Sequence, residues 1–348
     1  MGKSKYISDH MFNTLLLYRS KNLGTLGLRT LFEKYECAEK IIHTIERGEI
    51  YTKMEIKLAE EKSIHEEIEN TIKIGGNFFL TSDLKINNLC NIPPILVYSG
   101  NINLLYAHEK IAIVGTREPT ILGLKYTAML CEQIDHVTIS GLAKGIDAAV
   151  HNHSLNRTIA IIPGGLDKFY PEENFNLQKL IEKHGLIITD KPIGFKIKKE
   201  NFPQRNNLIA SLCSSIIVVE CQIGSGALIT AKYAKNYDKT VFVVPSHPLD
   251  QMYSGNLSLF TSKIGTLFLS AKDLENTNYT LYEEKKLEKL ENYMYNNILK
   301  FLSPIPVHVN DIVKYTNLHI STVLTIIGDL ELQGKIHINI LMEVRLKL

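Results

Sequence analysis

The chain has 348 residues and a mass of 39.4 kDa, a length typical of about two domains, or three if some are small. Lys and Arg number 39 against 37 Asp and Glu, a formal charge of +2, and 45% of the residues are hydrophobic. This composition excludes a disordered polyelectrolyte and a histone-like tail. Any binding of nucleic acid must therefore depend on a local basic surface.

The five cysteines are far apart and form no C-x-x-C pair, which argues against a disulfide framework and a zinc site. We therefore expect a reduced, cytoplasmic location and no bound metal. The N-terminal apolar stretch is too short for a signal peptide, and no apolar run of about 18 residues occurs. We expect neither a membrane span nor a membrane partner.

Residues 9 to about 70 carry apolar side chains at helical spacing, among them Leu15, Leu16, Ile41 and Ile42, with breaks at glycines. The spacing predicts a small helical module. We place its limits at residues 1–84.

From residue 111 onward the pattern changes to short β-branched runs that alternate with amphipathic segments. The runs are 111–114, 137–140, 158–162, 186–189, 216–220 and 240–244, with a weaker run at 266–270 that predicts an edge strand. Runs that are apolar throughout are typical of a parallel sheet covered by helices on both faces. We therefore predict a doubly wound α/β domain over 85–275, with ligands bound at the carboxyl ends of its strands.

The C-terminal part begins with a polar, charged stretch at 276–290, which predicts a linker. Residues 291–348 follow the order helix, helix, turn, helix and two short strands, which indicates a winged helix. The stretch 319–334, which would hold the recognition helix, contains neither Lys nor Arg. Since groove recognition relies on such side chains, we expect protein contacts or weak duplex affinity from this domain.

Four strands are followed by glycine-containing loops that open a helix, at 115–117, 140–145, 163–165 and 224–226. Each loop by itself is ordinary turn chemistry. Four such loops at one edge of a sheet predict a cradle of backbone N–H groups and helix N-termini for a phosphate. A single glycine in GTREPT argues against NAD and FAD, and no Walker sequence occurs, so we expect no cofactor.

Cationic side chains accompany these loops. Arg117 and Lys144 are either solvated surface cations or phosphate contacts, and their position at strand ends favours contacts. The segment 191–205 adds further lysines, interleaved with Phe195 and Phe202, and is either a solvated loop or a groove that follows a nucleic-acid strand. The secondary basic contacts expected there are Lys196, Lys198 and Lys199.

Asp147 and His151 are four residues apart and share one helix face. They could form an acid/base or metal pair, but no third ligand and no nucleophile is evident. The sequence favours a carboxylate at a helix start and an ordinary histidine. We therefore predict no enzymatic activity and no catalytic residue.

The central segments together resemble one known family, the DNA-processing protein A family, called DprA or Smf. The matching stretches are IPPILVYSGN at 92–101, IAIVGTR at 111–117, ISGLAKGIDAAVH at 139–151, TIAIIPGGLDKFYPEEN at 158–174, FPQRNNLIASL at 202–212, VVECQIGSGALITAKYA at 218–234 and VFVVPS at 241–246. The flanking modules are also similar to those of long family members, a SAM-like or helix-hairpin-helix-like N-terminal module and a C-terminal winged helix.

This resemblance implies a Rossmann-like domain that binds single-stranded DNA, loads the RecA recombinase onto it and protects incoming DNA during natural transformation. It also implies a homodimer formed through the same domain. The residues that it assigns to phosphate binding are Gly115, Thr116, Arg117, Ser140, Gly141, Lys144, Gly145, Gly164, Arg205, Asn206, Ser225 and Gly226.

The sequence departs from the family pattern in a few places. Asn207 stands where the family has an arginine, which implies one cation fewer at the edge of the pocket, and the segment 251–266 matches poorly. Two alternative functions stay open. One is a nucleotide phosphoribohydrolase, whose Pro-Gly-Gly motif begins at Pro163 but lacks its glutamate here. The other is a nucleotide sensor that signals through the winged helix.

Overall fold

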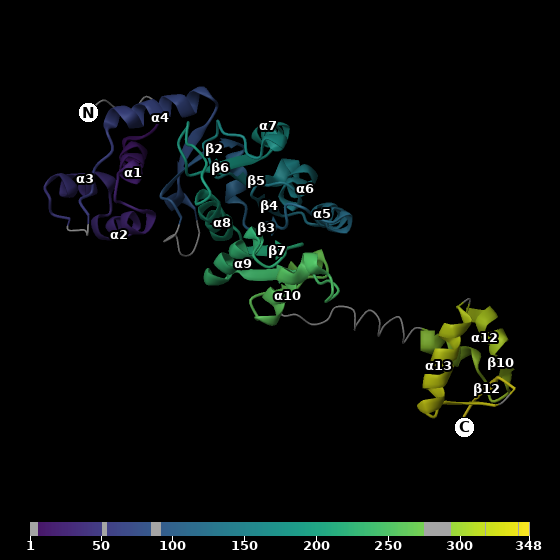
Figure 1. Cartoon of the computed structure of the whole chain (residues 1–348). Coiled ribbons are helices and arrows are strands. Elements are labelled where there is room, and N and C mark those ends of the chain that lie inside the picture. The colour runs from purple at the N-terminus through teal and green to yellow at the C-terminus, as the bar shows by residue number, and fades with distance from the viewer. Residues whose placement is uncertain are drawn as a thin grey trace. The chain divides into compact units, whose positions relative to one another are not determined.

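The computed structural model describes residues 6–50, 54–84, 92–274, 294–316, 318–339 and 341–347 (Figure 1). Contacts within the chain divide it into two units, Met1–Asp273 and Leu274–Leu348. The domain limits expected at residues 84 and 275 stay predictions. The linker expected at 276–290 lies outside the described residues.

The strands described in the larger unit form one sheet in the order β1-β2-β6-β5-β4-β3-β7-β8-β9. Their bounds are Asn77–Leu80 (β1), Ile95–Gly100 (β2), Lys110–Val114 (β3), Val137–Ser140 (β4), Thr158–Ile161 (β5), Leu186–Thr189 (β6), Ser215–Val218 (β7), Thr240–Val243 (β8) and Thr266–Leu267 (β9). All neighbours from β6 to β9 are parallel, whereas β1 and β2 pair antiparallel at the other edge. The predicted doubly wound α/β sheet is confirmed, and the antiparallel pair extends it.

Helices cover both faces of this sheet (Figure 1). They are α5 (Ile121–Gln133), α6 (Ile146–His153), α7 (Phe175–His184), α8 (Asn201–Leu212), α9 (Gly226–Asn236) and α10 (Ser254–Thr261). Strand β5 shows why its run is apolar throughout. Ile159 and Ile161 belong to the core that includes α8 and α9, whereas Ala160 and Ile162 belong to the core that includes α7. Successive strand residues point to opposite faces, so both sets are buried.

The predicted N-terminal helices are α1 (Asp9–Arg19), α2 (Thr25–Tyr35), α3 (Ala38–Glu46) and α4 (Glu61–Lys73). Their buried side chains do not form a core of their own. Leu15 and Ile41 belong to the same hydrophobic cluster as Ile95, Val97 and Ile187 of the sheet. These short helices therefore bury their apolar faces against β2 and β6.

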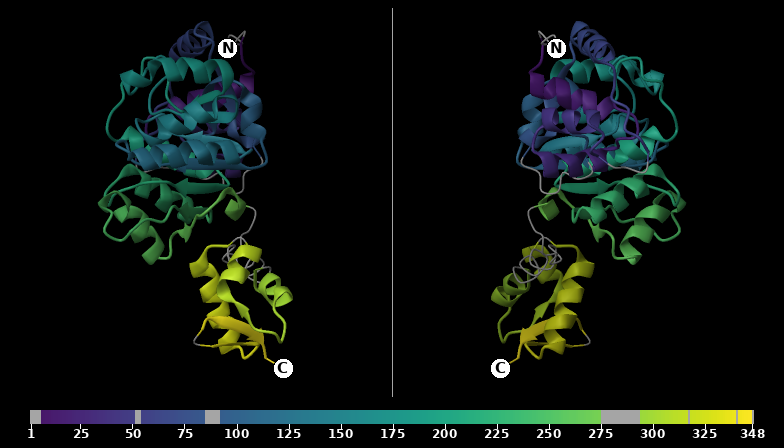
Figure 2. Two further views of the ribbon diagram at one scale, coloured as in Figure 1. Left: turned by 90° about the vertical axis from the view of Figure 1, so that its right-hand side faces the viewer. Right: turned by 90° about the vertical axis from the view of Figure 1, so that its left-hand side faces the viewer.

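The smaller unit has the predicted winged-helix order, with one short strand added before its second helix (Figure 2). Residues 294–301 are helical and precede β10 (Val307–His308), α12 (Val309–Thr316), α13 (Ile320–Leu332), β11 (Ile336–Ile338) and β12 (Glu343–Leu346). The strands form an antiparallel sheet in the order β10-β12-β11. Ile298, Ile312, Val323 and Ile327 form its separate core. Among the helices described in either unit, none has both the length and the apolar character to cross a membrane.

Candidate nucleic-acid interface

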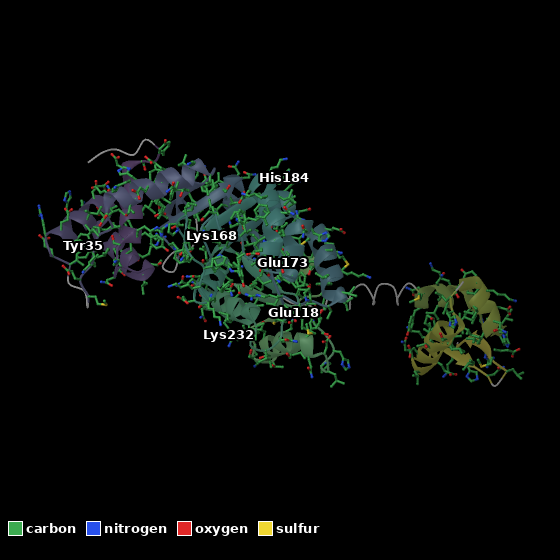
Figure 3. The ribbon with its side chains drawn as sticks, turned by 45° about the horizontal axis from the view of Figure 1, so that its top comes forward. Tyr35, Glu118, Lys168, Glu173, His184 and Lys232 are labelled. Carbon is green, nitrogen blue, oxygen red and sulfur yellow. The ribbon has the colours of Figure 1, made fainter. Side chains whose placement is uncertain are left out.

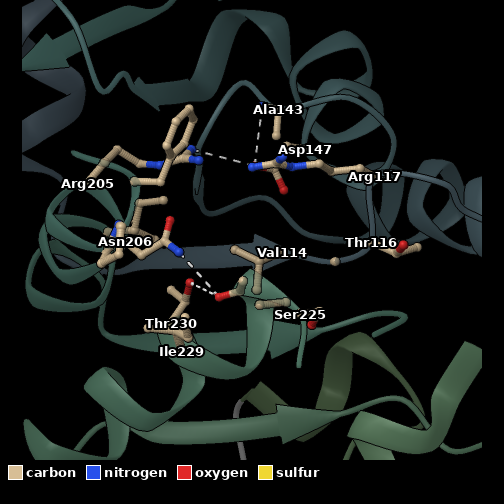
Figure 4. A pocket seen from close by; sticks show the side chains of 16 residues that line it. Val114, Thr116, Arg117, Ala143, Asp147, Arg205, Asn206, Ser225, Ile229 and Thr230 are labelled. Atoms are coloured by element: carbon tan, nitrogen blue, oxygen red, sulfur yellow. Dashed lines mark hydrogen bonds and ion pairs between the residues drawn. The ribbon is translucent and has the colours of Figure 1, made fainter. Parts of the chain in front are cut away.

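The order of the strands creates a switch point between β3 and β7. From β3 the chain proceeds to β4, β5 and β6 on one side, and from β7 it proceeds to β8 and β9 on the other. The loops that leave these neighbouring strands therefore diverge, which opens a crevice at their carboxyl ends. A cavity of about 360 Å³ lies there, lined by the loop after β3, by α8 and by the start of α9 (Figure 4). We call it the anion cavity.

Seven of the twelve residues assigned to phosphate binding line the anion cavity. They are Gly115, Thr116, Arg117, Arg205, Asn206, Ser225 and Gly226. They come from three loops or helix starts that are far apart in the sequence. The sheet therefore brings together the first loop, the last loop and α8, as expected when parallel strands end at one edge.

Arg205 of α8 enters the cavity from one side and is only 7% exposed. Its Nη1 donates a hydrogen bond to the carbonyl of Gly141 and lies 3.8 Å from Oδ2 of Asp147. Burial lowers the pKa of Arg205, and the Asp147 carboxylate opposes that shift. Its Nε has no hydrogen-bond partner in the described part of the chain. A buried cationic donor without a partner is costly, and an anion in the cavity would satisfy it.

Arg117 enters from the opposite side of the cavity (Figure 4). Its guanidinium lies 5.5 Å from the ring centroid of Phe202, in cation–π contact. It pairs with no carboxylate among the described residues. The charge of Arg117 also lowers the pKa of Arg205, so two like charges act on one cavity. An anion between the two arginines would relieve this repulsion.

The N-terminus of α9 forms a third wall. Ser225 is the N-cap residue and Gly226 is the first helical residue. The Gly226 carbonyl accepts hydrogen bonds from Asn206 Nδ2 at 3.3 Å and from Thr230 Oγ1 at 3.1 Å. The buried hydroxyl oxygen of Ser225 makes no hydrogen bond within the described ranges. A helix N-terminus carries a partial positive charge, which adds to that of the two arginines.

The loop after β4 supports the cavity from behind. Ser140 Oγ donates to the carbonyl of Ile113 at 2.7 Å, and the backbone N–H of Gly141 donates to Asp147. Gly145 has φ of +76°, and a Cβ there would lie 2.4 Å from the carbonyl oxygen of Thr116. Ser140, Gly141 and Gly145 support the loop that carries Thr116 and Arg117 and do not line the cavity, whereas Ala143 and Asp147 do line it.

Lys144 and Gly164 also lie outside the cavity wall. Lys144 Nζ pairs with Oε1 of Glu173 at 2.6 Å on the surface, and Glu173 is labelled in Figure 3. Gly164 is buried, and its carbonyl accepts a hydrogen bond from Thr189. The secondary basic residues Lys196, Lys198 and Lys199 are exposed in the segment before α8. Phe195 is half-buried and lies under the ammonium group of Lys191, 5.3 Å away.

Asp147 and His151 both hold the loop after β4. Asp147 Oδ2 accepts hydrogen bonds from the backbone N–H groups of Gly141 and Ala143, at 3.1 and 3.4 Å. Burial lowers the pKa of His151 to about 3. The neutral imidazole accepts from the N–H of Leu142 at Nε2 and therefore donates through Nδ1 to Thr158. These contacts give the pair the structural role that the sequence favoured.

Two buried polar residues at this edge were missed by the sequence analysis. The Glu220 carboxylate, after β7, accepts hydrogen bonds from the N–H and the hydroxyl of Thr120, and burial raises its pKa. Asn256, in the poorly matching segment, donates to three backbone carbonyls and accepts from the N–H of Cys221. Both fasten neighbouring loops of the site. The sequence did hold a signal for each residue: Glu220 ends an apolar run, and Asn256 directly follows a glycine.

Asn207 does not line the anion cavity. Its Oδ1 accepts a hydrogen bond from the hydroxyl of Tyr237, and its side chain lines a second, smaller cavity on the other side of α8. Position 207 therefore does not line the anion cavity, and the weaker pocket edge expected from the missing arginine stays a prediction.

Comparison with known proteins shows which family and which relatives the chain is similar to. Residues 82–278 match the family of DNA recombination-mediator protein A, and residues 291–338 match the DprA winged helix domain. The chain is 40% identical to Protein Smf of Synechocystis over 48% of its own length and 44% of that protein. It is 38% identical to DNA processing protein DprA of Streptococcus pneumoniae, over 49% of this chain and 62% of the relative. The matches therefore span only about half of these two relatives' lengths.

A third relative and two solved structures agree with this assignment. DNA processing protein DprA of Bacillus subtilis is 34% identical, over 61% of this chain and 74% of the relative. The X-ray structure of the Streptococcus pneumoniae protein superposes with a TM-score of 0.63 at 28% identity, over 79% of this chain and all of that one. A Helicobacter pylori structure, which concerns the single-stranded DNA binding mode of its DNA processing protein A, has a TM-score of 0.54 at 28% identity, over 58% of this chain and 94% of that one. By its central domain and its winged helix, the chain belongs to the DNA recombination-mediator protein A family.

Proposed function

We propose that the chain binds single-stranded DNA in the anion cavity and acts as a recombination mediator, which loads RecA onto incoming DNA and protects that DNA during natural transformation. The observation that carries the binding proposal is the pair of guanidinium groups that enter one cavity from two sides. Arg117 has no carboxylate partner, and the buried Nε of Arg205 has no acceptor, in the regions that the structure describes. A phosphate group would give Arg117 an anionic partner and the Nε of Arg205 a hydrogen-bond acceptor.

Aromatic side chains beside the cavity favour a single strand over a duplex. Phe202 lies next to Arg117, and its ring packs edge-on against Tyr170, with 5.3 Å between the ring centroids. Rings beside a phosphate site can stack on bases that are free of pairing partners. The relative from Helicobacter pylori is itself described as a protein that binds single-stranded DNA.

The polar groups near the cavity favour binding over catalysis. Asp147, His151 and Glu220 are each occupied by hydrogen bonds to neighbouring loops. The phosphoribohydrolase alternative would need a carboxylate after Pro163. Asp167 follows that motif, but it accepts from the N–H of Gly194, pairs with Lys168 and does not line the cavity. We therefore propose a protein that acts without a catalytic residue.

The partners are part of the same proposal. RecA and a second copy of the chain, joined through the Rossmann-like domain, are expected from the family. An assay of RecA filament growth on a strand coated with a single-strand-binding protein tests whether RecA is a partner. Growth that this protein does not accelerate would contradict the loading role. Sedimentation of the full chain tests the second, and a monomer at micromolar concentration would contradict the homodimer.

The DNA-binding proposal is tested by fluorescence anisotropy with a labelled thymidine oligomer, single-stranded and paired, over a series of salt concentrations. We expect preference for the single strand, with log K falling by about 0.7 per phosphate contact for each unit of log salt. Single-strand binding no tighter than about 10⁻⁴ M would match weak non-specific association and contradict the proposal. A mononucleotide that binds more tightly than the oligomer would favour the nucleotide sensor.

A further inference from the structure

A second cavity, of about 190 Å³, lies on the other side of α8, against the N-terminal helices. Its walls come from α1 and α2, from the segment before β2, from the end of β6 and from α8. The lining residues are Tyr18, Thr25, Pro93, Asp190, Lys191, Gln204, Asn207 and Leu208. Neither the family resemblance nor the comparisons assign a role to this cavity, which we call the α8 rear cavity.

The two cavities lie on opposite faces of one helix. Arg205, Asn206 and Ile209 line the anion cavity, whereas Gln204, Asn207 and Leu208 line the rear cavity. Residues three and four apart in a helix share a face, and Gln204, Asn207 and Leu208 have this spacing. Both cavities therefore begin at the first turns of α8, separated by the width of that helix.

The charges in the rear cavity disfavour a phosphate there. Asp190 Oδ2 accepts a hydrogen bond from Tyr18 at 3.0 Å and pairs with Lys191 Nζ at 2.9 Å. The carboxylate thus balances the one ammonium group among the described residues that line the cavity. The anion cavity, in contrast, holds two guanidinium groups for one carboxylate. A neutral ligand fits the rear cavity better than an anion.

The remaining groups suit a flat ring with carbonyl oxygens. The Tyr18 ring, fixed by its hydrogen bond to Asp190, joins Pro93 and Leu208 in an apolar wall. Gln204 Oε1 accepts from Lys191 Nζ at 2.9 Å, and Asn207 Oδ1 accepts from the Tyr237 hydroxyl. The oxygens of both amides are therefore engaged, whereas their NH₂ groups donate to no acceptor within the described ranges. Apolar walls with amide donors are the means by which proteins bind unpaired nucleobases.

Basic residues mark a path between the two cavities. Lys198 and Lys199 are exposed and lie just before Glu200, the N-cap residue of α8, near the positive end of the helix dipole. A helix is about 10–12 Å across. With a phosphate about every 3.4 Å along a stacked strand, about three nucleotides would cross the helix end.

We propose that the α8 rear cavity is a nucleobase subsite. It would take an unpaired base about three nucleotides away from the phosphate held by Arg117 and Arg205. The inference rests on the proposed binding of single-stranded DNA and adds that the N-terminal helices contribute to it through Tyr18 and Thr25. The protein would thus bind the strand on both faces of α8, through a phosphate on one face and through a base on the other.

The test compares a thymidine oligomer with an abasic oligomer of equal length, using the full chain and fluorescence anisotropy. We expect the wild type to bind the thymidine oligomer about tenfold more tightly than the abasic one, within the range of stacking on a protein ring. In Gln204→Leu and Asn207→Leu this ratio should fall to about threefold or less, with abasic binding unchanged. Gln133→Leu, at an exposed glutamine outside both cavities, is the matched control. Gln204 is exposed, so its variant keeps the test valid if Asn207→Leu fails to fold.

Photo-crosslinking gives an independent readout of position. A single 4-thiothymidine is moved along the oligomer, and the crosslinked peptides are identified by mass spectrometry. Crosslinks to the peptides that contain Tyr18 or Pro93 support the subsite. An unchanged thymidine-to-abasic ratio in Gln204→Leu, or crosslinks that never reach these peptides while the oligomer is bound, would overturn it. Absence of any single-strand binding by the wild type would instead overturn the proposed function.

Discussion

Arg117 and Arg205 face the same cavity but differ in what else they support. Arg117 is exposed and contacts only the Phe202 ring among the interactions that the structure describes, so its replacement should leave the fold intact. We expect Arg117→Glu to weaken binding of the thymidine oligomer at least 100-fold, because about 3 kcal/mol of charge-assisted hydrogen bonding is lost and repulsion replaces it. Anisotropy measures the effect. Lys125→Glu, an equal charge change at an exposed residue of α5, should bind normally, and equal losses in both variants would contradict the assignment.

Arg205 is also a structural residue, because its guanidinium lies beside the buried carboxylate of Asp147. Arg205→Met leaves that charge unpaired, which should lower the free energy of unfolding by about 3–5 kcal/mol. Urea denaturation at pH 7 measures this loss. Adding Asp147→Asn should restore part of the stability, though not DNA binding. Additive losses in the double variant would show that the two charges are not coupled.

His151 should make the stability of the fold dependent on pH. Its pKa is about 3 in the folded chain against an ordinary value of 6.5, so the unfolded chain binds the proton more tightly. Its contribution is fully present above pH 6.5 and is lost as the pH falls, by about 2 kcal/mol at pH 5. Urea denaturation at pH 7 and pH 5 should therefore show a smaller difference for His151→Gln than for His153→Gln, at an exposed histidine of α6. If the loss of stability between pH 7 and pH 5 were equal in the two variants, His151 would not be a source of the pH dependence.

At the scale of the elements, the start of α8 is where the exposed lysines, Phe202 and the buried Arg205 come together. If a strand crosses this end, Lys198 and Lys199 contact its phosphates. The double variant Lys198→Ala/Lys199→Ala should reduce the slope of log K against log salt by about 1.4, or 0.7 for each contact. Lys232→Ala/Lys235→Ala, at exposed lysines of α9, is the matched control, and Lys232 is labelled in Figure 3. An unchanged slope in the α8 variant would remove these residues from the DNA path.

At the scale of the whole molecule, the two units have separate cores, and every residue of the anion cavity belongs to the larger one. A chain that ends at Asp273 should therefore bind the thymidine oligomer within about threefold of the full chain, at the same salt concentration. The winged helix alone should not bind duplex DNA in a sequence-specific manner, because α13 carries neither Lys nor Arg. A footprint of residues 274–348 on duplex DNA would contradict this expectation.

The sequence by itself determined the parallel strands and the edge at which the loops meet. Runs such as 158–162 and 186–189 are apolar at every position, a pattern that two buried faces require. Parallel strands end on one side of the sheet, so glycine loops after several strands had to lie near one another. The winged helix was equally predictable from the sequence, because its helices and strands follow local periodicity. Strands β1 and β2 were not predicted, because their pairing joins segments without a distinctive pattern.

Only the tertiary structure decided which side chains face the cavity. Arg205, Asn206 and Asn207 are consecutive, yet the first two line the anion cavity and the third lines the rear cavity. Each helical residue turns by about 100°, so the packing of α8 between the sheet and the N-terminal helices sets what each position contacts. Lys144, expected at the phosphate, pairs on the surface with Glu173, which is 29 residues away in the sequence. Local patterns specify elements and their edges, whereas the direction of a side chain depends on neighbours that are remote in sequence.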